Sequence, residues 1–341
     1  MIDVHKALAP VNNFAKYKDV KSILIKGLDN PNTKVSICIP TYKRVDTLKD
    51  TIASCLNQVG FDDYVIIVSD NNPERDDETE QYINSIDNPR ILYYKHEQNI
   101  GMYGNLNRLY ELSRSEYTVC VHDDDILLPD FIRICYEYLS KNNEIDIIYP
   151  GKINWDGTGD NPKEKLPPRI NTYKMGLLDF INDNPCPPTG MMCRTQSMIK
   201  IGGYGYDGYP SNDFYFNVKA VSHLVVYRLD FGLYVYRWAI NTSLKKETLL
   251  NFMTVDPPLV RYNCSQNCLT RLSYRLYILD YSYYWVNRFR QFYPCDTISN
   301  VDNDIVLKFT SVSVLQLKLF KHLNHLVKKI YHYLHHDYIL T

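Results

Sequence analysis

Short apolar runs alternate with amphipathic stretches between residues 35 and 151, and this rhythm leaves the chain few folds to adopt. The apolar runs are rich in β-branched residues and predict strands, whereas the stretches between them repeat at helical spacing. The expected strands are 35–40, 64–70, 91–96, 117–125 and 145–151, and the expected helices are 46–58, 76–86, 101–115 and 129–142. Strands that alternate with helices in this way indicate βαβ units. We therefore expect an α/β fold whose mostly parallel sheet is flanked by helices.

Polar clusters stand at the ends of three of these strands, at Pro40–Arg44, Asp70–Pro73 and Asp123–Asp125. Ligands of open α/β sheets bind in the crevice beyond the carboxyl ends of the strands. We therefore expect the three clusters to converge on one cleft.

The last cluster consists of three consecutive aspartates, Asp123, Asp124 and Asp125, directly after an apolar run. Neighbouring carboxylates repel by about 1 kcal/mol in water and by more inside a protein. One of them could cap a helix beginning at Pro129, but a cap position uses a single carboxylate. Mg²⁺ and Mn²⁺ bind through one or two carboxylates together with substrate phosphates. Such a metal also neutralises the charge that builds on a departing diphosphate, so the cluster suits a nucleotide-diphosphate donor.

Four motifs follow one another in the first half of the chain: VSICIPTYKR, YVIIVSDNNP, NIGMYGNLN and HDDDILLPDF. With these motifs the sequence resembles glycosyltransferase family 2 over residues 34–150, and more weakly over 185–245. The resemblance implies a GT-A-type, Rossmann-like fold and an enzyme that depends on Mn²⁺ or Mg²⁺. It further implies transfer of a sugar, with inversion, from a nucleotide-sugar donor such as a UDP-sugar to a glycan or lipid-linked saccharide. The product would belong to a cell-surface polysaccharide.

The resemblance also assigns roles to single residues. Tyr42 corresponds to the residue that packs on the nucleobase, Asp70 to the aspartate that hydrogen-bonds the base, and Asp123 to an acid near the ribose and diphosphate. Asp124 corresponds to the usual metal ligand, and Asp125 is a second candidate ligand. The remaining candidates for nucleotide binding are Pro40, Arg44, Asn99 and Gly101, with Asn107 in the same motif.

Structural alternatives remain open for several of these residues. Tyr42 could be an ordinary surface tyrosine, and Asp70 is a good first residue for the Asp-Asn-Asn-Pro turn. Lys43 and Arg44 could mark a solvated helix start, and Gly101 could serve only as a loop bend.

The resemblance places the catalytic base after a glycine-rich turn, and here GGYGYDGYPSND supplies Asp213 at that place. A base must reach the proton of the acceptor hydroxyl. Asp207 is a rival for this role, and Asp213 could instead be a first-turn acid that favours the helix dipole. Relatives often carry a histidine shortly after a Tyr-Arg pair, which YVYRWAINTS lacks; Arg237 could bind phosphate and Trp238 could cover the sugar.

The division expected along the chain is an N-terminal extension (1–33), a nucleotide-sugar-binding half (34–150), an acceptor-binding half (151–245) and a helical C-terminal region (246–341). In the last region an apolar stripe recurs at helical spacing, and its members are Leu319, Leu323, Leu326, Ile330 and Leu334, widened by Phe320, Val327 and Tyr331. Nearby lysines make this a basic amphipathic helix, which could lie on an anionic membrane. The alternatives are docking on the catalytic domain or on a second subunit in a homodimer.

Composition excludes several classes of protein. The net charge of −1 and the isoelectric point near 6.7 argue against a nucleic-acid partner. Nine cysteines, with Cys264 and Cys268 the one close pair, form neither a disulfide framework nor a metal motif, as in a reducing compartment. With no secretory signal or membrane span in the sequence, we expect a cytoplasmic protein, either soluble or at the inner face of the membrane.

Two other functions compete with sugar transfer. A non-catalytic scaffold could bind a nucleotide-sugar or glycan with the same fold, although the intact carboxylates argue against it. A sugar-phosphate nucleotidyltransferase needs a glycine-rich phosphate loop after its first strand, and IPTYKR contains no glycine.

Overall fold

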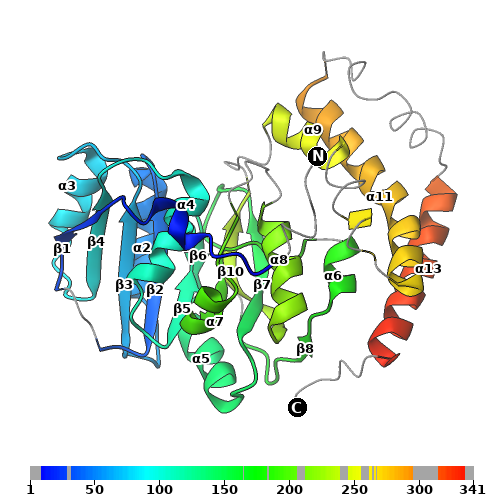
Figure 1. Ribbon diagram of the computed structural model, residues 1–341, viewed down its shortest axis with the longest axis horizontal. Coiled ribbons are helices and arrows are strands. Elements are labelled where there is room, and N and C mark those ends of the chain that lie inside the picture. The colour runs from blue at the N-terminus through cyan, green and yellow to red at the C-terminus, as the bar shows by residue number, and fades with distance from the viewer. Residues whose placement is uncertain are drawn as a thin grey trace.

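The computed structural model describes residues 9–28, 32–163, 165–182, 184–205, 212–238, 245–254, 261–262, 265, 267–294 and 314–334. These residues form one ten-stranded sheet with helices on both faces and further helices on one side (Figure 1). The strand order is β1-β4-β3-β2-β5-β9-β7-β10-β6, and β8 pairs with β10. In this part of the chain no helix is both long and apolar enough to cross a membrane.

The first half of the sheet confirms the predicted alternation. Strands β2 (Val35–Thr41), β3 (Tyr64–Asp70), β4 (Ile91–His96) and β5 (Tyr117–Cys120) run parallel to one another. The helices between and after them are α2 (Val45–Leu56), α3 (Glu78–Ser85), α4 (Gly101–Leu112) and α5 (Phe131–Lys141). Because parallel strands need crossover connections, each of these helices covers a face of the sheet.

The second half gives the sheet its mixed character. Strand β9 (Met191–Arg194) lies antiparallel between β5 and β7 (Ile147–Trp155), and β10 (Val226–Arg237) runs parallel to β7. Two short strands, β6 (Ile126–Leu127) and β8 (Thr172–Lys174), pair antiparallel with β10. The sheet therefore runs without a break across the boundary expected near residue 150.

The N-terminal extension contains one element that the sequence analysis did not predict. Strand β1 (Ser22–Lys26) adds an antiparallel edge to β4, after a short 3₁₀ helix, η1 (Phe14–Tyr17). Phe14 is buried, and the Asn13 side chain donates to the backbone oxygen of Gly202 at 3.0 Å. Asn13, Phe14 and β1 are thus part of the folded domain.

Two apolar layers fill the space between the sheet and its helices. One layer joins the sheet to α2, α3 and α5, with Leu48, Ile52, Ile83 and Phe131 buried in it. The other joins it to α4, α6 (Leu177–Asn182), α7 (Thr195–Lys200) and α8 (Asn212–His223). The β-branched strands are buried on both faces, as expected for a covered sheet.

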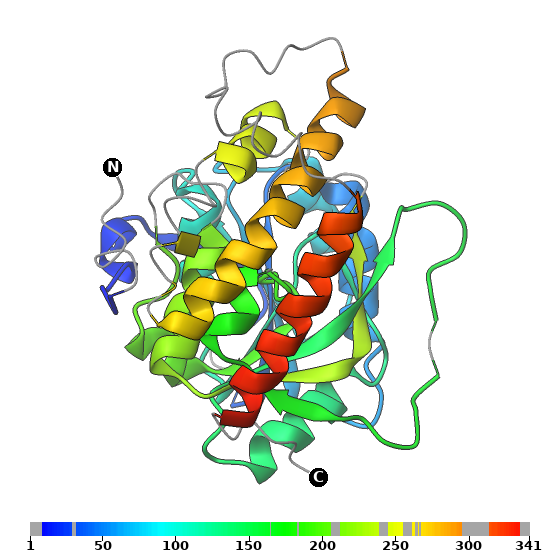
Figure 2. The ribbon, with the colours of Figure 1, turned by 90° about the vertical axis from the view of Figure 1, so that its right-hand side faces the viewer.

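The C-terminal region is helical in its described residues, as predicted. It contains α9 (Lys246–Thr254), α11 (Cys268–Phe292) and α13 (Val314–Leu334). Helix α11 begins with a capping box between Asn267 and Thr270 and packs against α6, α9 and α13. Figure 2 shows α11 and α13 side by side on the outside of the molecule.

Helix α13 docks through one edge of the predicted stripe. Val327 and Tyr331, which widen the stripe, are buried together with Leu317, whereas Leu319 and Leu323 are 56% and 41% exposed. The described leucines of the stripe therefore do not dock on the rest of this chain, and contact with a membrane or a second subunit stays a prediction. The helix has two apolar faces, and the sequence pattern alone could not tell which one meets α11.

Candidate active site

The carboxyl ends of β2, β3 and β5 meet at one edge of the sheet, as predicted. Thr41 and Asp70 are paired in register at the ends of β2 and β3, and the Thr41 hydroxyl donates to Asp123 Oδ2 at 2.8 Å. Pro40 lies half-buried in β2 next to Ser69 of β3. The first and third polar clusters are thus in direct contact.

The aspartate cluster is held by donors from several elements. Arg44 contacts two of its members: Nη1 lies 3.0 Å from Asp123 Oδ1, and Nη2 lies 2.6 Å from Asp124 Oδ2. The backbone N–H of Tyr42 is in weaker contact with the Asp123 carboxylate. Asp125 Oδ1 accepts from the backbone N–H of Arg237 at 2.9 Å, which connects the cluster to β10.

Asp125 has one oxygen that the protein does not satisfy. Its Oδ2 is buried without a well-formed hydrogen bond among the described residues, and the Thr189 hydroxyl is only in weak contact with this carboxylate. A buried carboxylate oxygen without a partner is costly, and a cation removes that cost. This atom indicates that a positive ligand completes the site.

The electrostatics of the cluster point the same way. Burial raises the pKa of Asp123 to about 6, an effect opposed by the neighbouring Arg44. Burial, reinforced by the charge of Asp124, raises the pKa of Asp125 to about 8. Burial thus disfavours the ionised form of both carboxylates, and a bound cation would favour it.

A third potential ligand precedes the aspartates. His122, Asp124 and Asp125 place one ligand atom each within 4.8 Å of the others. Burial lowers the pKa of His122, which favours the neutral imidazole that binds metals. The sequence analysis missed His122, although its place in HDDD was a usable signal. Two carboxylates, one imidazole and an unsatisfied oxygen fit a divalent cation.

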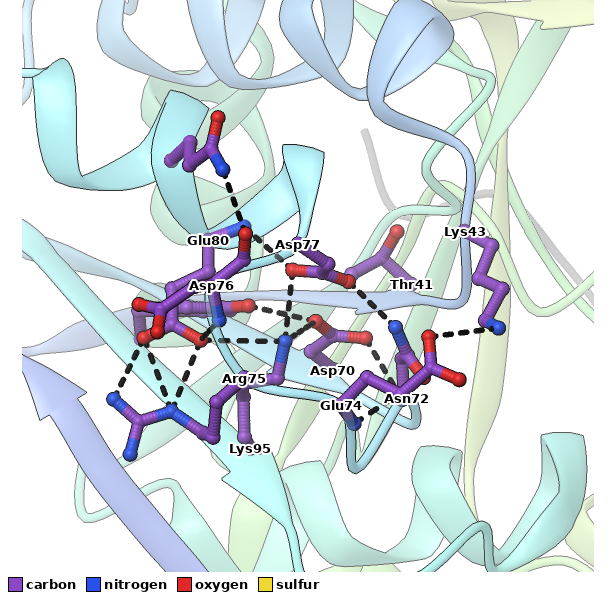
Figure 3. Close-up of polar contacts among 12 residues, drawn as sticks. Thr41, Lys43, Asp70, Asn72, Glu74, Arg75, Asp76, Asp77, Glu80 and Lys95 are labelled. Atoms are coloured by element: carbon purple, nitrogen blue, oxygen red, sulfur yellow. Dashed lines mark hydrogen bonds and ion pairs between the residues drawn. The ribbon is translucent and has the colours of Figure 1, made fainter.

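Asp70 lies in a different environment, shown in Figure 3. Its side chain is fully buried; Oδ1 accepts from the backbone N–H of Asn72 at 2.9 Å, and Oδ2 accepts from the Tyr93 hydroxyl at 2.6 Å. The ammonium of Lys95 lies 3.2 Å from the same Oδ2. Burial raises the pKa of Asp70, and these donors oppose that rise. In this structure Asp70 holds the loop after β3, and its contact with a nucleobase stays a prediction.

Lys95 is the centre of a buried charge cluster behind that loop. It is 2% exposed and lies 2.9 Å from Asp77 Oδ1 and 3.5 Å from Glu80 Oε2 (Figure 3). Arg75 pairs with Glu80 at 2.7 Å and closes the cluster toward solvent. The loop of residues 70–80 is therefore held by ion pairs between residues from different sequence motifs.

We expect Tyr93→Phe to lower the free energy of unfolding by about 1.5–3 kcal/mol, because a hydrogen bond to a buried carboxylate is lost. Tyr64→Phe is the matched control: this tyrosine is also buried, but its hydroxyl donates to the neutral backbone oxygen of Cys55 at 3.0 Å. Its loss should cost only about 1 kcal/mol. Urea denaturation measures both values, and equal losses would contradict a special role for the Tyr93–Asp70 contact.

The loop before α4 is tied to the same edge of the sheet. Asn71 donates to Asn99 Oδ1 at 2.9 Å and accepts from the backbone N–H of Ile100 at 2.8 Å. Asn99 Oδ1 also accepts from the backbone N–H of Gly101, whose φ of +74° favours glycine. Asn99 and Gly101 thus lie beside the end of β3, and their contact with a nucleotide stays a prediction. Tyr42 is 46% exposed there, so its ring is accessible to a ligand.

Asn107, from the same motif as Asn99, is buried on α4 and bonds both backbone polar atoms of Tyr204, at 2.9 and 2.8 Å. Lys219 of α8 donates to the backbone oxygen of Gly203 at 2.5 Å. Both contacts fix the turn that leads toward α8. In this structure Asn107 therefore holds the backbone of the turn at Tyr204.

Asp213 lies in the first turn of α8 and is half-buried. Its Oδ2 accepts from Asn184 Nδ2 at 2.8 Å, and its Oδ1 accepts from the backbone N–H of Phe214 at 2.8 Å. The segment from Asn184 ends near Thr189, whose hydroxyl accepts from the backbone N–H of His122 at 3.1 Å. This segment connects the base candidate to the acidic cluster. The rival Asp207 lies outside the described residues.

Arg237 and Trp238 follow at the end of β10. The guanidinium of Arg237 is 2.9 Å from Asp50 Oδ2 and lies 4.9 Å from the centre of the Trp155 ring. Arg237 is thus partly engaged by the protein, but its Nε is buried without a hydrogen-bond partner among the described residues, and its contact with a phosphate stays a prediction. Trp238 is 37% exposed and packs under Arg288.

The profile of glycosyl transferase family 2 matches residues 36–202, which span β2 to the turn after α7. An uncharacterised glycosyltransferase of Methanocaldococcus jannaschii is 26% identical over 203 residues, covering 59% of this chain and 68% of that protein. The Staphylococcus aureus poly(ribitol-phosphate) beta-N-acetylglucosaminyltransferase TarP is 28% identical over 148 residues, covering 43% of this chain and 44% of TarP.

Solved structures show the same fold. S. aureus TarS in complex with UDP-GlcNAc aligns with a TM-score of 0.53 and 17% identity, over 81% of this chain and 78% of TarS. A mannosyltransferase from Pyrobaculum calidifontis in complex with GDP-Man and Mn²⁺ aligns with a TM-score of 0.51 and 10% identity, over 95% and 90% of the two chains. The fold and the family match define the chain as a glycosyltransferase with the GT-A fold. It belongs, through residues 36–202, to glycosyltransferase family 2.

Proposed function

We propose that this enzyme transfers a sugar, with a divalent cation, from a nucleotide-diphosphate donor to a glycan or a lipid-linked saccharide. The observation that carries this proposal is the His122, Asp124 and Asp125 cluster at the strand ends, with its unsatisfied oxygen on Asp125. Support for a UDP-sugar comes from TarS, which binds UDP-GlcNAc in the same fold. Support for Mn²⁺ comes from the mannosyltransferase that binds it.

His122, Asp124 and Asp125 would hold the cation. When bound, the cation would neutralise charge on the diphosphate. Arg44 now neutralises Asp123 and Asp124, and its side chain is 34% exposed. Arg44 therefore lies at the rim of the site. Once a bound metal ion neutralises the aspartates, the Arg44 guanidinium would be available to bind phosphate. The exposed Tyr42 ring offers a stacking surface for the nucleobase.

Asp213 is the base that we propose for the transfer. Its carboxylate would take the proton of the acceptor hydroxyl while the acceptor oxygen bonds to the anomeric carbon. The bond from that carbon to the donor phosphate breaks at the same time, and the nucleoside diphosphate leaves with the electron pair. Attack from the face opposite the leaving group inverts the anomeric centre.

For the acceptor we propose a growing cell-surface polysaccharide or its lipid-linked precursor. TarP, which matches within the same domain, is named for transfer onto poly(ribitol-phosphate). The described cysteines are free thiols, as expected in a reducing compartment, so we place the reaction in the cytoplasm.

Thermal unfolding with UDP, GDP, dTDP and CMP, each with and without Mn²⁺, tests the donor site. A nucleotide at a hundred times its dissociation constant should add about 2.7 kcal/mol of stability. We expect UDP with Mn²⁺ to raise the midpoint, and UDP with EDTA to raise it much less. Stabilisation that is equal in EDTA would contradict the metal part of the proposal. If no nucleotide stabilises the protein under either condition, the donor site is wrong.

A further inference from the structure

Helix α13 presents an apolar face to solvent. Five residues at spacings of three and four make up this leucine face, and their exposed fractions are 78%, 56%, 41%, 54% and 42% for Leu315, Leu319, Leu323, Leu326 and Ile330. In a folded chain, exposed apolar side chains gathered on one helix face mark a contact surface.

The helix does not need this face to stay in place. Its other face is buried against α11, where Ser273 donates to Asn324 Oδ1 at 2.5 Å and Lys321 pairs with Asp280 at 3.1 Å. Val327 and Tyr331 are buried on that side. Figure 2 shows α13 beside α11 on the outer side of the molecule. Because the residues that contact α11 lie on the other side of the helix, the leucine face is turned away from α11.

Charge distinguishes among the partners that could cover this face. Helix α13 carries Lys318, Lys321, Lys328 and Lys329 and no acidic residue. With 3.6 residues per turn, Lys318 and Lys329 fall along one border of the leucine face. Two copies joined through this face would bring their lysines together without acids from α13 to balance them. An anionic lipid surface takes up both the leucines and the lysines.

We propose that α13 binds the surface of an anionic membrane through its leucine face, with Lys318 and Lys329 against the lipid headgroups. The helix would lie in the plane of the interface and bury only this face. This contact rests on α13 alone and needs neither the donor nor the acceptor proposed above. It would hold the enzyme at the surface where a lipid-linked acceptor resides.

Flotation of the full chain with vesicles tests this contact. One vesicle preparation is phosphatidylcholine alone, and the other is equal parts phosphatidylcholine and phosphatidylglycerol. The first variant is Leu319→Gln with Leu323→Gln, and its control is Leu28→Gln, at an 88% exposed position beyond β1. The second variant is Lys318→Glu with Lys329→Glu, and its control is Lys200→Glu, at the exposed end of α7.

We expect the native chain and both controls to float with the anionic vesicles and hardly at all with phosphatidylcholine. The leucine variant should bind roughly tenfold more weakly for each leucine lost. Each lysine near an anionic surface contributes roughly fivefold, so the lysine variant should lose at least that factor per site. Far-UV circular dichroism and the thermal midpoint, both measured without vesicles or nucleotide, report folding and keep this test separate from that of the donor site.

Three results would overturn the proposal. The native chain could fail to float with either preparation. It could bind both vesicle preparations equally, and then the lysines do not recognise anionic headgroups. It could also sediment as a dimer that the leucine variant dissociates, and then a second copy covers the face.

Discussion

Asp124→Asn is expected to abolish the dependence of donor binding on Mn²⁺ and to reduce turnover by roughly 10²- to 10⁴-fold, the share that a catalytic metal supplies. The substitution keeps the volume of the side chain but removes the charge that a cation requires. It also leaves Arg44 with Asp123 as its ion-pair partner, so the loop keeps one of its two contacts. The measurements are turnover against Mn²⁺ concentration and thermal stabilisation by UDP with and without the metal.

The control for this experiment is Asp130→Asn. Asp130 stands just before α5, outside the cluster, and pairs with Arg133 at 2.6 Å. The Asp130→Asn enzyme should retain native turnover and native dependence on Mn²⁺. An Asp124→Asn enzyme with an unchanged Mn²⁺ requirement would refute the assignment of Asp124 as a ligand.

Asp213→Asn is expected to lower kcat by roughly 10²- to 10⁴-fold, because general base catalysis typically contributes this much. Donor binding with Mn²⁺ should stay at the native level, since the proposed role concerns the acceptor proton. The measurements are kcat at saturating donor and thermal stabilisation by the donor nucleotide.

A matched control separates catalysis from the alternative role of Asp213 as a first-turn acid. Asp179 has that position in α6, where its Oδ2 accepts from the backbone N–H of Gly176 at 2.9 Å. Asp179→Asn should lower stability slightly and leave kcat unchanged. If Asp213→Asn does only the same, its carboxylate serves the helix and the base lies elsewhere.

The fold was predictable where one local pattern decided the outcome. The runs that became β2, β3, β4 and β5 are buried on both faces, so β-branched composition and length identified them. The edge strand β1 was missed, because its apolar run is only three residues long, follows a polar segment and depends on pairing with β4. Edge strands carry the weakest sequence signal, since only one side of them is paired.

The site was predictable in position and less so in detail. The ends of β2 and β5 meet as expected, but the direction of a carboxylate depends on residues that are distant in sequence. Asp70 and Lys95 are paired in register on neighbouring strands, and that cross-strand contact turns Asp70 inward. Arg44 likewise meets Asp123 and Asp124 only because the fold joins β2 to β5. The sequence motif around Asp70 therefore could not predict its contact with Lys95.

The path of the sheet between β5 and β6 has a consequence for how the two halves of the catalytic domain could be separated. The aspartate loop, residues 121–125, connects β5 to β6. On the side away from β2, β5 pairs with β9, and β6 pairs with β10. Both β9 and β10 come from the half after residue 150. A fragment that ends there would keep the nucleotide-side motifs but lose the strands that hold the acidic loop on its far side. We therefore expect the two halves to fold as one unit, and a chimera that exchanges the half after residue 150 would also change the support of the aspartate loop.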